Sequence, residues 1–260
     1  MRFVRSATFA TVLLAVLWAP HAHGATSKWL LGAKGGFNSA KFVGDPVGLT
    51  INVSGLQLAG RIDGWREGFT AGAFARRQIN EFTGIQIELN YSQKGGEGAV
   101  NGLADVEYPG NVIRTAEING VTTIAMDYTE VPIFAVFSFP TDASEKATIT
   151  ASAGGYVAYN TAAWAYVEGE ARVQIQPGTT QIDTFDQRWG LGSIVNRWDV
   201  GGLLGLGLEV ALERVDLLFD FRWTFGFLSI DDTDQNQSIR NNVISLTFGL
   251  GFPLGGEVGE

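Results

Sequence analysis

The stretch VDLLFDFRWTFGFL, from Val215 to Leu228, alternates large apolar residues with polar or charged ones. Because successive side chains of a β-strand point to opposite faces, one face of this strand is apolar and the other carries charge. The apolar positions are Leu217, Phe219, Phe221, Trp223, Phe225 and Phe227. This alternation fits a soluble barrel or sandwich with the apolar face inside. It fits equally a membrane barrel with that face toward lipid.

Composition narrows the class of protein. The chain has 260 residues, with 34 glycines, 17 phenylalanines and no cysteine. Without cysteine it has no disulfide, no thiolate metal site and no lipid-modified N-terminal cysteine. The net charge of −9 is the wrong sign for binding nucleic acid through its phosphates.

The N-terminus predicts export. Two arginines in MRFVR precede an apolar run that ends at Pro20, and small residues precede Ala25. This pattern predicts a signal peptide over residues 1–24, cleaved between Gly24 and Ala25. A membrane anchor would need about 20 apolar residues, more than this run supplies. Residues 25–260 would then form one β-barrel domain without histidine.

Seven further segments alternate in the same way: 29–37, 68–78, 84–94, 123–139, 146–159, 197–209 and 241–254. Most are long enough to cross a bilayer at a tilt, which takes about 9–11 residues. The connections 38–66, 95–122, 160–196 and 229–240 are long, whereas 79–83, 140–145 and 210–214 are short. Outer-membrane barrels show this alternation of long extracellular loops and short periplasmic turns.

The polar face of these segments consists mostly of small uncharged residues, which suit a narrow interior. Its ionisable residues carry both signs, and we expect them to pair across the lumen. This predicted polar network comprises Lys34, Glu88, Glu209, Asp220 and Arg222. The sequence therefore predicts an all-β fold, an eight-stranded antiparallel up-and-down transmembrane β-barrel of the bacterial outer membrane, with its phenylalanines toward lipid.

Two local signals refine this prediction. Asn119–Gly120 lies between two β-prone runs, VIRTAEI and VTTIAMDY, and predicts a hairpin turn in the second long loop, continuing into the next membrane strand. Segment 123–139 changes phase near Pro132, which predicts a β-bulge because proline cannot donate to the strand ladder.

Several of these strands carry a family resemblance. GFTAGAF and EFTGIQIELNYSQKGG resemble the second and third strands of the PorT-like outer-membrane β-barrel family, with Glu88, Leu89, Tyr91, Lys94 and Gly95 as the motif residues. DYTEVPIFAVF resembles its Y-x-E-x-P strand, and RNNVISLTFGLGFPL its final strand. The resemblance spans residues 29–254 and marks strands, with no active site. It implies an outer-membrane barrel and, through the family name, a part in secretion or gliding machinery.

Motifs for metals and cofactors are incomplete. DDTDQNQ, residues 231–237, places Asp232, Asp234 and Asn236 at positions one, three and five of a calcium loop. That loop also needs a glycine at position six and a glutamate at twelve, where this chain has Gln237 and Val243. The pattern therefore favours a solvated loop, and QKGGEG and GGLLGLG likewise lack the spacing of phosphate-binding loops. We expect no cofactor.

The sequence favours a non-enzymatic integral outer-membrane protein with a packed lumen. Its partners would be outer-membrane lipid, the barrel-assembly machinery during biogenesis and a protein that contacts its long extracellular loops. The alternatives are a soluble periplasmic lipocalin-like carrier of an apolar ligand and an outer-membrane component of a secretion or gliding apparatus. A lipid hydrolase is disfavoured, because a serine nucleophile usually needs a histidine base.

Overall fold

The computed structural model describes residues 29–53, 56–108, 112–141, 147–176, 179–192, 194–212, 214–232 and 238–254. The predicted signal peptide lies outside them. In these ranges the chain forms β1 (Trp29–Gly44), β2 (Val47–Val53), β3 (Leu56–Gly64), β4 (Arg66–Asn80), β5 (Thr83–Tyr108), β6 (Val112–Pro140), β7 (Ala147–Gln176), β8 (Thr179–Gly190), β9 (Trp198–Ala211), β10 (Asp216–Gly226) and β11 (Ile239–Leu254). Within the same ranges, no helix has the length and hydropathy needed to cross a membrane.

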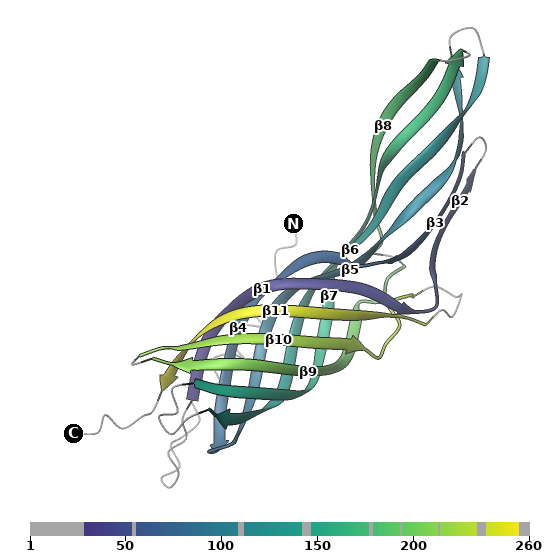
Figure 1. Ribbon diagram of the computed structural model, residues 1–260. Helices are drawn as coiled ribbons and strands as arrows, with labels where there is room; N and C mark the ends of the chain where they lie inside the picture. The colour runs from purple at the N-terminus through teal and green to yellow at the C-terminus, as the bar shows by residue number, and fades with distance from the viewer. Residues whose placement is uncertain are drawn as a thin grey trace, which may run out of the picture.

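Eight of these strands close into a barrel. In order around the ring they are β1, β4, β5, β6, β7, β9, β10 and β11, and every neighbouring pair is antiparallel. β1 closes the ring, because it pairs with β11 on one side and with β4 on the other, as where Trp29 lies opposite Leu254 and Arg77. Figure 1 shows the ring of strands. Each of the eight strand segments predicted from the sequence corresponds to one of these strands, with ends that extend at most two residues past it, so the predicted barrel is confirmed. A closed ring leaves no unpaired strand edge in the membrane.

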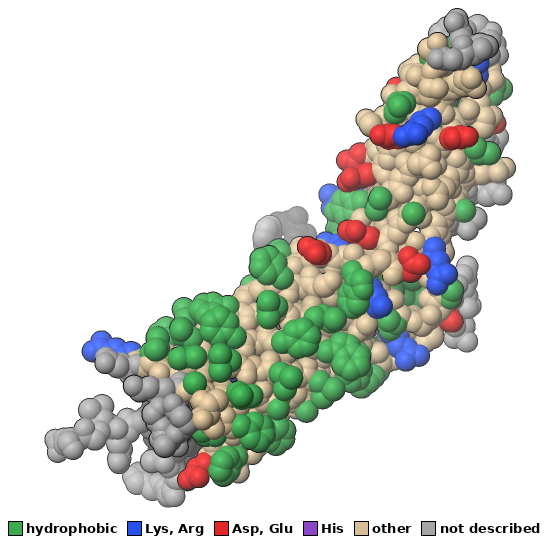
Figure 2. Space-filling view, viewed as in Figure 1, with side chains coloured by type: hydrophobic (Ala, Val, Ile, Leu, Met, Phe, Trp, Pro, Cys, Tyr) green, Lys and Arg blue, Asp and Glu red, His purple; other side chains and the backbone are tan. Residues whose placement is uncertain are grey.

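The two faces of the wall are oriented as a membrane barrel requires. On β10, Phe221 is 49% exposed, whereas its neighbour Arg222 is 5% exposed and points inward. Apolar side chains cover the outside of the barrel as a broad band (Figure 2). A soluble monomer rarely exposes a continuous apolar surface of this extent. The band therefore faces lipid and the charges face the lumen.

The long connections form a second structure. Beyond the barrel, β5, β6 and β7 continue without a break, β3 pairs with β5, and β8 pairs with β7. The result is a six-stranded sheet in the order β2-β3-β5-β6-β7-β8, which we call the arm (residues 47–64, 95–124 and 161–190). It rises at an angle from one end of the barrel (Figure 1). Its inner face has its own apolar core, made by Leu58, Val100, Ile118 and Val167.

The hairpin predicted at Asn119–Gly120 is wrong. Asn119 lies in the middle of β6 and pairs with Asn101 of β5 and Glu170 of β7. The chain reverses instead between Tyr108 and Val112. An Asn-Gly pair forms a hairpin turn when its two flanking runs pair with each other. Here both runs belong to one strand and pair with different neighbours.

The bulge predicted at Pro132 is also misplaced. Pro132 points inward and stays in register with Tyr156 of β7. The ladder with β5 keeps one register across this region, from Ile87 opposite Ile133 to Asn90 opposite Glu130. The register shift lies between Asp127 and Tyr128, opposite β7, at the level where the barrel wall becomes the arm.

Candidate functional site in the barrel lumen

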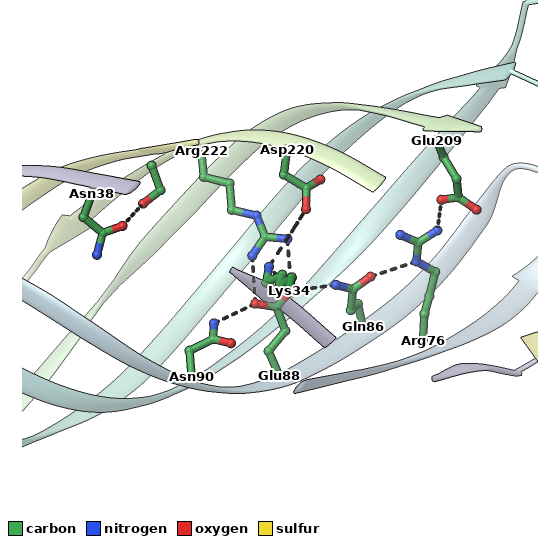
Figure 3. A network of polar contacts seen from close by, with 10 residues as sticks. Lys34, Asn38, Arg76, Gln86, Glu88, Asn90, Glu209, Asp220 and Arg222 are labelled. Atoms are coloured by element: carbon green, nitrogen blue, oxygen red, sulfur yellow. Dashed lines mark hydrogen bonds and ion pairs between the residues drawn. The ribbon is translucent and has the colours of Figure 1, made fainter. Parts of the chain in front are cut away.

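Two layers of polar side chains fill the lumen together with two apolar clusters, one of Leu30, Phe74 and Leu218 and one of Phe134, Val136 and Leu203. They come from the alternate positions of the barrel strands that do not face lipid, so the alternation that builds the apolar band also builds the polar interior. The first layer is the network shown in Figure 3. The second, which we call the upper cage, comprises Lys94, Tyr128, Glu130, Tyr156, Asp199 and Asn241.

Glu88 of β5 is the centre of the first layer. Its side chain has no exposed surface, and its Oε1 accepts a hydrogen bond of 2.6 Å from Lys34 Nζ. Arg222 of β10 donates to both carboxylate oxygens, over 2.8 and 3.0 Å. Gln86 Nε2 and Asn90 Nδ2 donate at 2.6 and 2.8 Å. Such complete pairing is what keeps a buried carboxylate charged, and the two-point guanidinium contact fixes β10 relative to β5.

The network continues in two directions from this centre. Asp220 Oδ2 accepts from Arg222 Nη2 at 3.1 Å and lies 3.9 Å from Lys34 Nζ. On the other side, Gln86 Oε1 accepts from Arg76 Nε at 2.8 Å, and Arg76 forms an ion pair with Glu209 of β9 (Figure 3). Three cations and three carboxylates therefore balance, and the network connects β1, β4, β5, β9 and β10 across the lumen.

The structure places all five ionisable residues named from the sequence in this network: Lys34, Glu88, Glu209, Asp220 and Arg222. Glu209 reaches the others only through Arg76 and Gln86. Sequence reasoning missed Arg76, Gln86 and Asn90. Gln86 and Asn90 share the inward parity of Glu88 on β5, which is a signal that could have found them.

The upper cage surrounds Lys94, which is almost completely buried. Its ammonium group lies 2.5 Å from Glu130 Oε1 and 3.1 Å from Asp199 Oδ2. The same nitrogen lies 4.8 and 4.4 Å from the ring centres of Tyr128 and Tyr156, within cation–π range. Sequence reasoning did not find this cage, because Lys94 and Asp199 are 105 residues apart and only barrel closure brings them together.

Asp199 holds the cage together. Tyr156 Oη donates to its Oδ2 at 3.1 Å, and Asn241 Nδ2 donates to the same oxygen at 2.9 Å. These contacts connect β5, β7, β9 and β11. The cage therefore ties the barrel wall together at the end from which the arm rises.

Little space remains between the two layers. The cavity between them has a volume of about 30 Å³ and is lined by residues of both layers, among them Lys34, Glu130 and Arg222. That is room for about one water molecule. Among the described residues, no group of His, Asp or Glu is arranged to hold a metal ion. Asp232 belongs to the described part of the chain, and the other two candidate calcium ligands, Asp234 and Asn236, lie outside it.

The closed eight-stranded ring, its apolar outer band and its polar interior together define a small transmembrane β-barrel. Residues 19–232 match the family described as outer membrane protein beta-barrel domain. The chain belongs to this family and is a β-barrel of the bacterial outer membrane. No curated protein matches its sequence.

Solved structures of small barrels are similar to this chain at low sequence identity. Ail, the attachment invasion locus protein of Yersinia pestis, is 12% identical, with a TM-score of 0.35 over 86% of this chain and 98% of Ail. Neisserial surface protein A is 12% identical, with a TM-score of 0.35 over 86% of this chain and 97% of that protein. The N-terminal barrel domain of Pseudomonas aeruginosa OprF is 10% identical, with a TM-score of 0.33 over 89% and 100%.

Proposed function

We propose that this protein is a non-enzymatic outer-membrane barrel with a closed lumen that carries the arm on the cell surface for contact with a partner. The observation that carries the proposal is the continuity of β5, β6 and β7 from the barrel wall into the arm. A barrel built only to anchor itself would need no such extension. The extension therefore supports a role for the arm outside the membrane.

The pairing in the lumen supports the non-enzymatic part of the proposal. A general base must reach the proton that it removes, directly or through one water. Both oxygens of Glu88 are already occupied by Lys34 and Arg222. The ammonium of Lys94 is enclosed by Glu130 and Asp199 in the same way. These groups are paired with one another, which supports a role in stabilising the wall.

The resemblance to the PorT-like family, and with it a part in secretion or gliding machinery, stays a prediction. Export is likewise a proposal: N-terminal sequencing of the protein extracted from outer membranes should begin at Ala25, whereas a sequence beginning at Met1 would contradict cleavage.

Orientation is the first property to test. An epitope tag inserted at 109–111, where β5 and β6 are joined, should be labelled by antibody on intact cells. A matched tag at 142–146, between β6 and β7 at the other end of the barrel, should be labelled only after the outer membrane is permeabilised. Labelling of the second tag alone on intact cells would place the arm in the periplasm and overturn the proposal.

A further inference from the structure

A hollow of about 320 Å³ lies on the outer face of the sheet where the barrel becomes the arm. Its lining includes Thr123, Ala125 and Asp127 of β6, which share the outward parity of the lipid-facing Ile133. β7 and β8 supply the opposite wall with Trp164 and Arg188. Charged side chains of both signs begin at this level, directly above the apolar band (Figure 2).

The hollow forms because small residues flank one large ring. Gly95, Ala125, Trp164 and Gly190 lie opposite one another in a single row across β5, β6, β7 and β8. Gly95 has a φ of +141°, and a Cβ there would lie 1.9 Å from the carbonyl oxygen of Ile124. Only glycine fits, so the strand has no side chain at this point. The sheet is therefore recessed at Gly95, which lies opposite Ala125, one strand away from Trp164.

The chemistry of the lining indicates a ligand with an anion and a ring. The Arg188 guanidinium stacks 3.6 Å from the Trp164 ring centre and 5.4 Å from that of Tyr166. None of the ion pairs among the described residues includes Arg188, so its N–H edge is available to a phosphate or carboxylate. Arg66 lines the other side and is oriented by its own 2.7 Å hydrogen bond to the Lys94 carbonyl.

Groups suited to hydroxyls complete the lining. Asp127 and Glu168 can accept hydrogen bonds from hydroxyl groups, and Tyr166 adds an aromatic surface on which the C–H face of a sugar can pack. Two guanidiniums and two carboxylates leave the hollow without net charge, which disfavours a purely anionic ligand such as inorganic phosphate. A sugar that carries one or two phosphates can contact the guanidiniums through its phosphates, the carboxylates through its hydroxyls and the aromatic rings through its C–H face.

The position of the hollow fits such a ligand. Asp127 is 13 residues from Pro140, the far end of β6, which is about 43 Å along the strand and about 33 Å along the membrane normal at the tilt of such barrels, more than the roughly 25 Å height of the apolar band. This is the level of the lipid headgroups and their sugars. The outer leaflet of an outer membrane is built of glycolipids whose headgroups are phosphorylated saccharides.

We propose that the hollow formed by Arg66, Asp127, Trp164, Tyr166, Glu168 and Arg188 binds a phosphorylated saccharide. In the orientation of the proposed function, on which this inference rests, the headgroup of a neighbouring outer-leaflet glycolipid can reach it from the side. A free phosphorylated glycan has the same chemistry and is the other source.

The test uses core oligosaccharide released from lipopolysaccharide by delipidation, with its phosphates retained, titrated calorimetrically into the barrel refolded in detergent. We expect saturable binding that weakens at least tenfold for Trp164→Ala and for Arg188→Gln, and at least tenfold when the oligosaccharide is dephosphorylated. Trp189→Ala is the matched control, because Trp189 is 44% exposed, adjacent in sequence and on the opposite face of β8. It should bind as the unchanged protein does.

Arg188→Lys separates charge from geometry: it should bind more weakly than the unchanged protein and more tightly than Arg188→Gln. Heat-modifiable gel mobility confirms in each case that the barrel has folded. Folded protein that binds no oligosaccharide, or variants at Trp164 and Arg188 that bind as tightly as Trp189→Ala, would overturn the proposal.

Vesicles distinguish the two sources. If the membrane glycolipid occupies the hollow, added oligosaccharide should bind the protein in phospholipid vesicles and should fail to bind in vesicles that also contain lipopolysaccharide. Equal binding in both vesicles assigns the hollow to a free glycan. Because the detergent titration does not depend on orientation, a failure of the proposed function would appear in the tag experiment and a failure of this inference in the titration.

Discussion

Replacing Arg222 by leucine tests the lumen network most directly. The Arg222 side chain is 6% exposed and makes two hydrogen bonds to Glu88 and one to Asp220. Removing one partner of a buried ion pair costs roughly 3–5 kcal/mol, because the remaining charge stays buried and uncompensated. Lys34 still pairs with Glu88 in the variant. We therefore expect a loss of about 3 kcal/mol, at the lower end of that range.

The assay is urea unfolding of the barrel in lipid vesicles, followed by tryptophan fluorescence and gel mobility. Adding Glu88→Gln to Arg222→Leu removes the uncompensated charge. The double variant should therefore lose less free energy of unfolding than the two single variants together, by at least about 1 kcal/mol. Arg172→Leu is the control, since the Arg172 side chain is 53% exposed and its ion pair with Glu170 is worth at most about 1 kcal/mol. Additive losses at Arg222 and Glu88, or a loss at Arg222 no larger than at Arg172, would refute the reasoning.

Three further predictions concern the wall, the lumen and the arm. Phe221→Arg should lower the free energy of unfolding in lipid by roughly 2–4 kcal/mol and Phe227→Arg, nearer the interface, by less than about 1 kcal/mol; equal losses in urea titrations would contradict the placement of the apolar band. Planar-bilayer recordings should show no large stable conductance, because an eight-stranded barrel has an interior that its side chains fill; porin-sized steps would refute a closed lumen. Gly95→Ala should destabilise the arm by several kcal/mol, since its Cβ would lie 1.9 Å from the Ile124 carbonyl oxygen. Gly48→Ala is the control: its Cβ would have no atom within 4 Å, so stability should change by less than about 0.5 kcal/mol. Limited proteolysis should cleave the arm of the first variant faster than that of the second.

The barrel could be predicted from the sequence because lipid imposes a strict rule. Every wall strand must alternate between lipid and lumen over about ten residues, and the stretch from Leu217 to Phe227 follows that rule, with Leu218 as the apolar exception on its inward face. The lumen ion pairs followed from the same parity, since charged residues on the inward face of a narrow barrel have only one another as partners. Arg76 was not predicted as part of the lumen network, because its segment alternates less regularly and Arg77 follows it directly.

The arm could not be predicted in the same way. Outside the membrane a sheet has water on one face, and polar, small and apolar residues are all tolerated there, so the periodicity weakens. Its strands are also continuations of wall strands, and the Asn119–Gly120 pair suggested a turn in the middle of one of them. The upper cage could not be predicted for a different reason. Its ion pairs depend on the order of the strands around the ring, and no local sequence pattern indicates that order.

The unbroken strands between barrel and arm have a mechanical consequence. From Asn160 to Gln176, β7 extends about 50 Å beyond the wall, and β5 and β6 run beside it with continuous hydrogen bonding. A force applied at the far end of the arm is therefore transmitted along these continuous strands directly into the membrane-embedded wall. The upper cage, with its Lys94–Asp199 ion pair, lies where the arm joins the barrel. A lateral force on the arm would act most strongly on the wall strands at this level, and the cage holds them together. In the proposed orientation, a partner bound to the arm would be held at a fixed height and direction relative to the membrane.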